Sequence, residues 1–202
     1  MITIHEVESP RDFKAFLEFQ YRLYRHDPLW VPYLRTEVRY LFSDKNPFWQ
    51  HATRALYLAR RGKEVVGRIA AIKDDELIKF KKDQEGVFGF YESVDDKEVA
   101  AALYDAAAGW LRAQGMRLMR GPMNPSTNEE CGFLLEGFDT PPFIMMTHTP
   151  AYYITLAEAC GLTKATDLQA WMMDISDDNN ARLKRVADGV RRRWPELEVR
   201  KI

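Results

Sequence analysis

Polar side chains that could bind a ligand crowd one segment of the chain, from Gly121 to Pro142. A strand-like run over residues 116–120 leads into this segment, and a helix-like run begins near Ala151 after it. In alternating α/β chains, ligands gather at the loop that leaves the carboxyl end of a strand. Side chains in such a loop could hydrogen-bond a ligand, or they could satisfy the loop's own backbone through turns. Both interpretations stay open for Asn124, Ser126, Asn128 and Glu129.

Other residues that could do chemistry lie at the edge of this segment or outside it. Glu92 ends an aromatic strand-like run, residues 87–92, where a carboxylate could act as a base or be an ordinary strand-end acid. Cys131 and His148 could form a thiol nucleophile with its base. No third group is spaced to order them, however, and a free cysteine is commonly a small buried hydrophobe. The 4 histidines form no pair at metal-ligand spacing, so we expect no metal site.

The composition predicts a globular chain without a polyanionic partner. Its 202 residues fit one domain of ordinary size, or one domain with an appendage, and 46% hydrophobic residues are ample for a core. The charges nearly cancel, with 29 Lys and Arg against 30 Asp and Glu, so we expect no nucleic acid and no membrane as a partner. Only 2 cysteines, with no secretory signal pattern or membrane span, predict a reducing, cytoplasmic location.

Hydrophobic periodicity predicts alternating strands and helices. The clearest helix covers residues 97–114, with Asp95 or Asp96 as its N-cap and Gly115 at its end. The clearest sheet element is a β-hairpin around a turn at Gly62. An earlier helix is expected to begin with Ser9 as its N-cap. The hairpin strands are residues 55–60 and 65–72; other strands are expected at residues 2–4, 87–92, 116–120, 168–175 and 197–202, and other helices at residues 10–26, 30–42, 150–160 and 177–193.

Several phrases of the sequence resemble a known family. They are Asn46-Pro47-Phe48-Trp49, Val66-Gly67-Arg68-Ile69-Ala70-Ala71, Phe88-Gly89-Phe90-Tyr91-Glu92, Trp110-Leu111-Arg112, the segment from Gly121 to Pro142, and Pro150-Ala151-Tyr152-Tyr153. With the element order β-α-α-β-β-β-α-β-α-β, the chain resembles the GNAT superfamily of acyl-CoA N-acyltransferases. Within that superfamily it resembles the N-terminal half of bacterial tandem-GNAT predicted acetyltransferases. The resemblance covers nearly the whole chain and implies an α/β fold, with a GNAT-like mixed central sheet flanked by helices and splayed central strands.

The resemblance also implies how the chain is divided. Residues 1–176 would form the GNAT-like domain, and residues 177–202 would form a helix and a strand. That terminal strand could join the sheet. Alternatively, the helix and strand could be a linker into a second GNAT-like domain that is absent from this chain. The expected protein partner is accordingly a second GNAT-like domain or, through a homodimer, a second copy.

The family's chemistry would place an acyl thioester between the splayed strands, with acetyl-CoA or another acyl-CoA as substrate and no metal. A backbone N–H would polarise the thioester carbonyl, a carboxylate would deprotonate a small-molecule or peptide amine, and a hydroxyl would protonate the leaving thiolate. The residues that this chemistry would use are Phe90 or Tyr91 for the carbonyl, Glu92 or Glu129 as base, Tyr152 or Tyr153 as acid, and Asn124, Ser126 and Asn128 for pantetheine. The resemblance therefore implies an acyl-CoA-dependent N-acyltransferase, of the acetyltransferase type, with an unknown acceptor.

Departures from the family pattern favour an alternative function. Active members carry a glycine-containing loop that binds the pyrophosphate of CoA, whereas this chain has Ser93-Val94-Asp95-Asp96-Lys97-Glu98 at that place. The family's tyrosine acid falls at Ala157, and a charged helix from Asp177 replaces the strand that would complete the fold. The alternative is a non-catalytic scaffold half that packs on a catalytic partner domain. A relative that handles aminoacyl or fatty-acyl groups is a third interpretation.

Overall fold

A mixed five-stranded sheet forms the centre of the protein in a computed structural model, which describes residues 1–172, 177–198 and 200. The strands lie in chain order across the sheet; the first three neighbouring pairs are antiparallel, and the last pair is parallel. The parallel pair follows from the helix that joins its two strands, because a parallel connection needs a crossover. The strands are β1 (Ile2–Glu6), β2 (Ala52–Arg61), β3 (Glu64–Asp74), β4 (Glu85–Ser93) and β5 (Leu118–Arg120).

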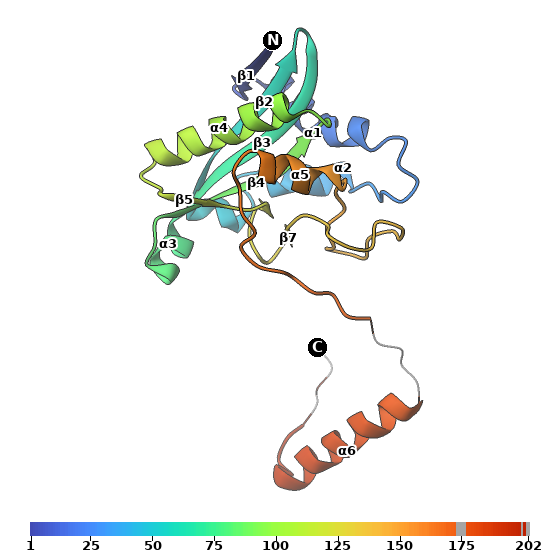
Figure 1. Cartoon of the computed structure of the whole chain (residues 1–202). Coiled ribbons are helices and arrows are strands. Elements are labelled where there is room, and N and C mark those ends of the chain that lie inside the picture. The colour runs from blue at the N-terminus through green and yellow to red at the C-terminus, as the bar shows by residue number, and fades with distance from the viewer. Residues whose placement is uncertain (173–176, 199, 201–202) are drawn as a thin grey trace. The chain divides into compact units, whose positions relative to one another are not determined.

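Helices cover both faces of this sheet (Figure 1). The core on one face contains buried residues of α4 and α5, and the core on the other contains buried residues of α1 and α2. The expected α/β class, with a mixed central sheet flanked by helices, is therefore confirmed. The helices are α1 (Pro10–Leu23), α2 (Arg35–Leu41), α3 (Asp75–Lys81), α4 (Lys97–Ala113), α5 (Tyr152–Ala159) and α6 (Asp177–Arg193), with a 3₁₀ turn η1 at Pro47–Gln50.

Local sequence signals explain where the main helices begin. The side chain of Ser9 accepts a hydrogen bond from the backbone N–H of Asp12 at 3.1 Å, and Pro10 occupies the first helical position of α1. At α4, Asp96 is the N-cap and accepts a hydrogen bond from the N–H of Glu98 at 2.8 Å. Both predicted caps are confirmed, and so is the predicted hairpin, which is β2 and β3.

The structure also departs from the sequence-based elements. Helix α3 was not predicted, since its seven residues are too few for a clear period and its N-cap is the last residue of a strand, Asp74. A short hairpin of β6 (Met123–Asn124) and β7 (Glu130–Cys131) was likewise missed. It lies inside the segment between β5 and α5, which we call the long loop. No strand forms over residues 168–172 or 197–198, and the rest of those two predicted strands lies outside the described residues, except for Arg200, which is not in a strand.

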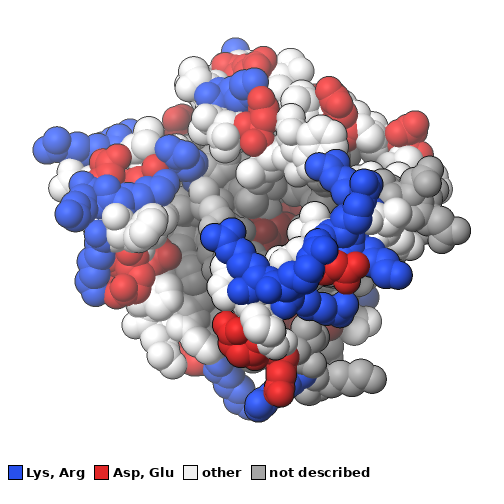
Figure 2. Space-filling view, turned by 90° about the horizontal axis from the view of Figure 1, so that it is seen from below, with Lys and Arg blue, Asp and Glu red and all other residues white. Residues whose placement is uncertain are grey.

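The chain falls into two compact units, Met1–Thr166 and Asp167–Ile202. The second unit contains α6, where Leu183 and Val186 are exposed and the last turn is Arg191–Arg193. No helix in the described part of the chain is long and apolar enough to span a bilayer. Acidic and basic side chains are interspersed in the view of Figure 2, in keeping with the nearly cancelling totals.

Candidate functional site

Strand β4 carries a β-bulge in its middle, which we call the break in β4. Phe90 has a φ of 48°, a left-handed conformation that costs a non-glycine residue about 1–3 kcal/mol and that clusters at functional sites. Phe90 and Tyr91 together face the single residue Ile69 of β3, because the register shifts there. On the other side, β4 pairs with β5 only as far as Val87 opposite Arg120, where β5 ends. The resemblance implied splayed central strands; here the β4–β5 ladder ends just before the bulge, and the backbone that follows β5 still lies against β4.

The start of the long loop packs against this break. A Cβ added to Gly89 would lie 1.7 Å from the carbonyl oxygen of Met123, so the loop backbone rests directly on β4. The next loop residue, Asn124, accepts a hydrogen bond from the N–H of Phe90 through its side-chain oxygen at 2.6 Å. An amide carbonyl thus already binds the N–H that we expected to polarise a thioester carbonyl. Tyr91 was the other candidate for that role, and its ring stacks on the ring of Tyr104 in the core.

The other polar residues of the loop do not reach the sheet. Ser126 accepts a hydrogen bond from the N–H of Asn128 at 3.2 Å, and its carbonyl accepts one from the N–H of Glu129 at 3.1 Å. These contacts satisfy a local turn. Asn128 and Glu129 are exposed. Of the four polar candidates in the loop, the structure therefore brings only Asn124 to the break in β4.

A buried polar cluster surrounds Glu92 near the end of β4. One carboxylate oxygen accepts hydrogen bonds from the hydroxyls of Tyr24 at 2.8 Å and Tyr153 at 2.7 Å. The other oxygen lies 3.7 Å from the guanidinium of Arg68. Burial raises the pKa of Glu92, and the charge of Arg68 opposes that rise. Both charged side chains are almost inaccessible, at 5% and 2% exposed, so they compensate each other inside the protein.

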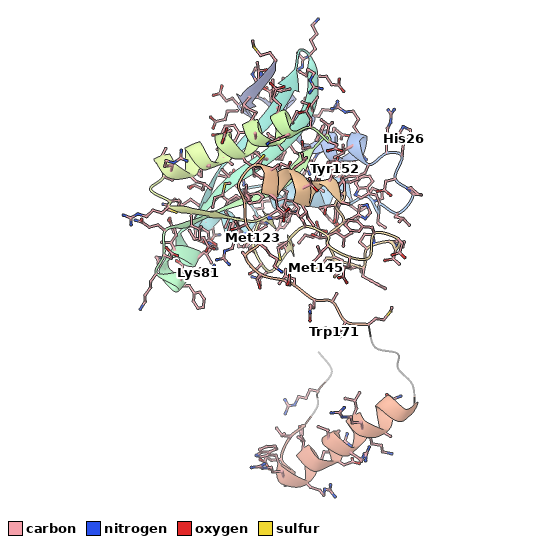
Figure 3. All side chains as sticks on the ribbon, in the orientation of Figure 1. His26, Lys81, Met123, Met145, Tyr152 and Trp171 are labelled. Carbon is pink, nitrogen blue, oxygen red and sulfur yellow. The ribbon has the colours of Figure 1, made fainter. Side chains whose placement is uncertain are left out.

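The two tyrosines of α5 close this cluster. Tyr153 is fully buried, and its hydroxyl accepts a hydrogen bond from the N–H of Ser93 at 2.9 Å. Tyr152, labelled on α5 in Figure 3, is half-buried and donates to the carbonyl of Ser93 at 2.8 Å. Burial raises the pKa of Tyr152 to about 12, so this hydroxyl is protonated at neutral pH. Three of the predicted catalytic residues, Glu92, Tyr152 and Tyr153, therefore lie together, and Glu129 does not join them.

Two polar bridges tie the loop to the segment that follows α1, and the sequence interpretation missed both. The hydroxyl of Tyr33 donates to the carboxyl of Glu130, which is paired with Asn124 in the β6–β7 hairpin. His148 lies with its Nε2 2.8 Å from a carboxylate oxygen of Asp27. Each bridge joins parts of the chain that are far apart in sequence, so no local pattern could have revealed it.

Glu130 should make the stability of the protein depend on pH. Burial raises the pKa of Glu130 to about 7 from an ordinary value of 4.5. Between these values the folded state holds a proton that the unfolded chain has released, so stability falls as pH rises through this window. We expect wild type to lose about 2 kcal/mol more than Glu130→Gln between about pH 5 and about pH 8, measured by urea unfolding. The exposed neighbour Glu129→Gln is the matched control. A wild-type dependence that survives in Glu130→Gln would contradict the assignment.

The N-terminus of α4 is already occupied by the chain's own carboxylate. Asp96 caps the helix and forms an ion pair with Arg61. A carboxylate at a helix N-terminus opposes the binding of an anionic ligand there, such as the pyrophosphate that the resemblance implied. The described residues contain no group of three or more His, Cys, Asp and Glu side chains that could hold a metal ion.

The sheet, its broken central strand and the flanking helices define an acetyltransferase fold of the GNAT type. The structure resembles the crystal structure of an aminoglycoside acetyltransferase from an uncultured soil metagenomic sample, in complex with sisomicin. The TM-score is 0.51 with 8% sequence identity, over 87% of this chain and 97% of that chain. At this identity the likeness shows the fold alone.

Sequence comparison finds two curated relatives, and no family model matches the chain. The chain is 40% identical over 187 residues to Protein YghO of Escherichia coli (strain K12), covering 92% of this chain and 48% of that protein. It is 38% identical over 179 residues to Bacterial ceramide synthase of Caulobacter vibrioides (strain NA1000 / CB15N), covering 88% of this chain and 47% of that protein. The chain thus spans about half the length of the curated relatives it matches.

Proposed function

We propose that this chain is an N-acyltransferase domain that transfers an acyl group from acyl-CoA to an amine. The observation that carries the proposal is the break in β4 at Phe90, which lies just past the end of the β4–β5 ladder and beside the buried cluster around Glu92. Such a break frees a backbone N–H from the ladder, and a fixed N–H donor is what a developing oxyanion needs. The acetyltransferase fold supports the same reaction class.

The thioester carbonyl would take the place of the Asn124 side chain on the N–H of Phe90. Both are carbonyl oxygens, so the exchange replaces one hydrogen bond by another of the same kind. The freed amide of Asn124 would then hydrogen-bond the pantetheine arm, with Ser126 and Asn128 further along the same loop. Acetyl-CoA or a longer acyl-CoA would be the acyl donor.

The tyrosines of α5 would handle the leaving group. Tyr152 is the better candidate for the acid, because it is half-buried and keeps its proton at neutral pH, whereas Tyr153 is fully buried and donates to Glu92. Glu92 accepts two hydroxyls already, so in this proposal it positions the tyrosines and does not take the amine proton itself. Glu129, exposed on the loop, would contribute negative charge near the acceptor.

The long loop is suited to an amine that carries an apolar chain. From Gly121 to Pro150 it contains no lysine or arginine, and its acids favour a cationic acceptor. Its outer part also exposes large apolar side chains, among them Phe143 at 73% and Ile144 at 94%. Met145 belongs to this exposed stretch, and Figure 3 labels it together with Met123 at the sheet. A ceramide is the fatty amide of a long-chain amino alcohol, so the relative of that name supports the same acceptor class.

A second candidate function, a non-catalytic scaffold half, is favoured by two contacts. Asp96 fills the helix end that would bind pyrophosphate, and Asn124 occupies the N–H of Phe90. In this proposal the chain packs on a second GNAT-like domain, within one longer protein or in a dimer, and helps to shape that domain's acceptor site. Acyl-CoA would then bind only when a domain with a glycine-rich loop is present.

Two measurements on the purified chain separate these candidates. Calorimetry with acetyl-CoA and with palmitoyl-CoA tests donor binding, and release of free CoA thiol tests transfer. We expect thiol release with sphinganine or dodecylamine as acceptor and none with dodecanol, which has the same chain without the amine. No binding heat from either acyl-CoA at millimolar concentration would reject autonomous catalysis and favour the scaffold function.

A further inference from the structure

We propose that Asp27 and His148 form a catalytic dyad, in which His148 is the general base that deprotonates the acceptor amine. This inference rests on the proposed acyl transfer. It assigns the general base, a role that neither Glu92 nor Glu129 takes. Glu92 is buried and accepts two hydroxyls, and Glu129 is exposed in a separate turn. An amine acceptor resembles a lysine side chain, with a pKa near 10.4, so it arrives protonated at neutral pH and needs a base.

The hydrogen bonds fix which nitrogen of His148 is free. Asp27 accepts a hydrogen bond from the N–H of Leu29 at 2.9 Å through one oxygen and lies 2.8 Å from Nε2 of His148 through the other. Burial favours a higher pKa for Asp27, but the hydrogen bonds from His148, Leu29 and Trp30, together with the charge of His148, hold the pKa below its ordinary value. The carboxylate is therefore charged at neutral pH and, in the neutral form of the imidazole, accepts the proton on Nε2. The lone pair of Nδ1 is left for a substrate proton.

Most of the ring of His148 is covered, but its second nitrogen is not fully buried. The side chain of His148 is 9% exposed and that of Asp27 is 34% exposed. Nδ1 of His148 has no hydrogen-bond partner within the described residues, and part of its surface is exposed. A mostly covered imidazole, held by a carboxylate at one nitrogen and open at the other, has the arrangement of a general base.

The ring of Tyr24 connects the dyad to the cluster around Glu92 at the end of β4. The rings of His148 and Tyr24 meet edge to face with their centroids 5.6 Å apart. The hydroxyl of Tyr24 in turn donates to Glu92. His148 also lies in the loop four residues before Tyr152, the proposed acid. The base and the acid thus approach the end of β4 from the same part of the chain.

A second histidine–aspartate pair in the protein shows what distinguishes this one. His51 lies with its Nδ1 2.9 Å from Asp74. The same oxygen of Asp74 accepts the N–H groups of Glu76 and Leu77, so this aspartate is the N-cap of α3. The aspartate of that pair caps a helix, whereas Asp27 and His148 join two segments near the end of β4.

The proposed step balances without a further reactant. The ammonium gives a proton to Nδ1 of His148, and the neutral amine nitrogen attacks the acyl carbonyl carbon. A C–N bond forms and the C–S bond breaks, which gives an amide and CoA thiolate. The attacking nitrogen loses its second proton as the amide forms, and the two protons end on the thiolate and in solvent, so His148 returns to its neutral form.

The test compares His148→Gln with wild type, using palmitoyl-CoA and sphinganine in the thiol-release assay. Glutamine can still bond to Asp27 but cannot accept the proton, so we expect kcat to fall about 100-fold or more with the KM for palmitoyl-CoA little changed. In His148→Gly, added imidazole should restore part of the lost rate. The matched control His51→Gln should keep the wild-type kcat. Thermal unfolding of each variant separates lost chemistry from lost folding.

The outcomes distinguish this inference from the proposed function. If wild type releases thiol and His148→Gln keeps kcat within a few-fold, the base assignment is wrong while acyl transfer stands. A folded His148→Gly that imidazole does not restore also overturns it. If wild type releases no thiol with any amine, the proposed function fails, and the base assignment fails with it.

Discussion

Replacing Gly89 with alanine is expected to destabilise the protein by about 3 kcal/mol or more. The new Cβ would lie 1.7 Å from the carbonyl oxygen of Met123, far inside contact distance. The obstructing atom is backbone and cannot rotate away, because Met123 is paired with Cys131 and the next residue, Asn124, binds Phe90. The substitution must therefore push the long loop off β4.

Urea unfolding measures this effect, and Gly109→Ala is its matched control. Gly109 lies inside α4, and a Cβ there would meet nothing within 4 Å. Alanine is the better helix former, so that substitution should stabilise by about 0.5–1 kcal/mol. Equal unfolding midpoints for Gly89→Ala and wild type would show that the loop does not rest on the sheet.

Replacing Glu92 with alanine is expected to cost about 3–5 kcal/mol, because it leaves a buried charge without its partner. Arg68 would remain 2% exposed with no counter-ion, and the hydroxyls of Tyr24 and Tyr153 would lose their shared acceptor. Glu92→Gln keeps an acceptor oxygen and should cost less. The double variant Arg68→Met with Glu92→Leu should recover part of the loss, since it removes both charges together.

The control for Glu92 is an ion pair at the surface. Glu18 accepts two hydrogen bonds of 3.0 Å from Arg35, but both side chains are well exposed. Water solvates and screens both charges of such an exposed pair. Glu18→Ala should therefore change the urea midpoint much less than Glu92→Ala. If the two variants lose the same stability, Glu92 is not the buried counter-ion that its contacts indicate.

The sequence predicted most of the fold because the signals for it are local. Ser9 and Asp96 mark helix starts within one turn, and Gly62 marks the hairpin turn between two apolar runs. The departures are short elements: α3 and the β6–β7 hairpin are too brief to show a period. Fold class and element order could therefore be predicted, while the path of the long loop could not.

The candidate site was predicted only in part, for a related reason. Glu92, Tyr152 and Tyr153 could be named because they lie at the ends of recognisable elements. The partners of Glu130 and His148 come from the segment after α1, far away in sequence, so Glu130 had no visible signal and His148 was considered only as a base for Cys131. Glu129 was named in place of its neighbour, since nothing in the chain shows which of the two adjacent acids turns inward.

The two bridges between the loop and the segment after α1 also bear on the order of folding. They join residues 97 and 121 positions apart, Tyr33 with Glu130 and Asp27 with His148. Closing such long spans costs chain entropy that only an already formed sheet can offset. We therefore expect the loop to dock after the hairpin, β4 and α1 have assembled, which would place its contacts among the last to form.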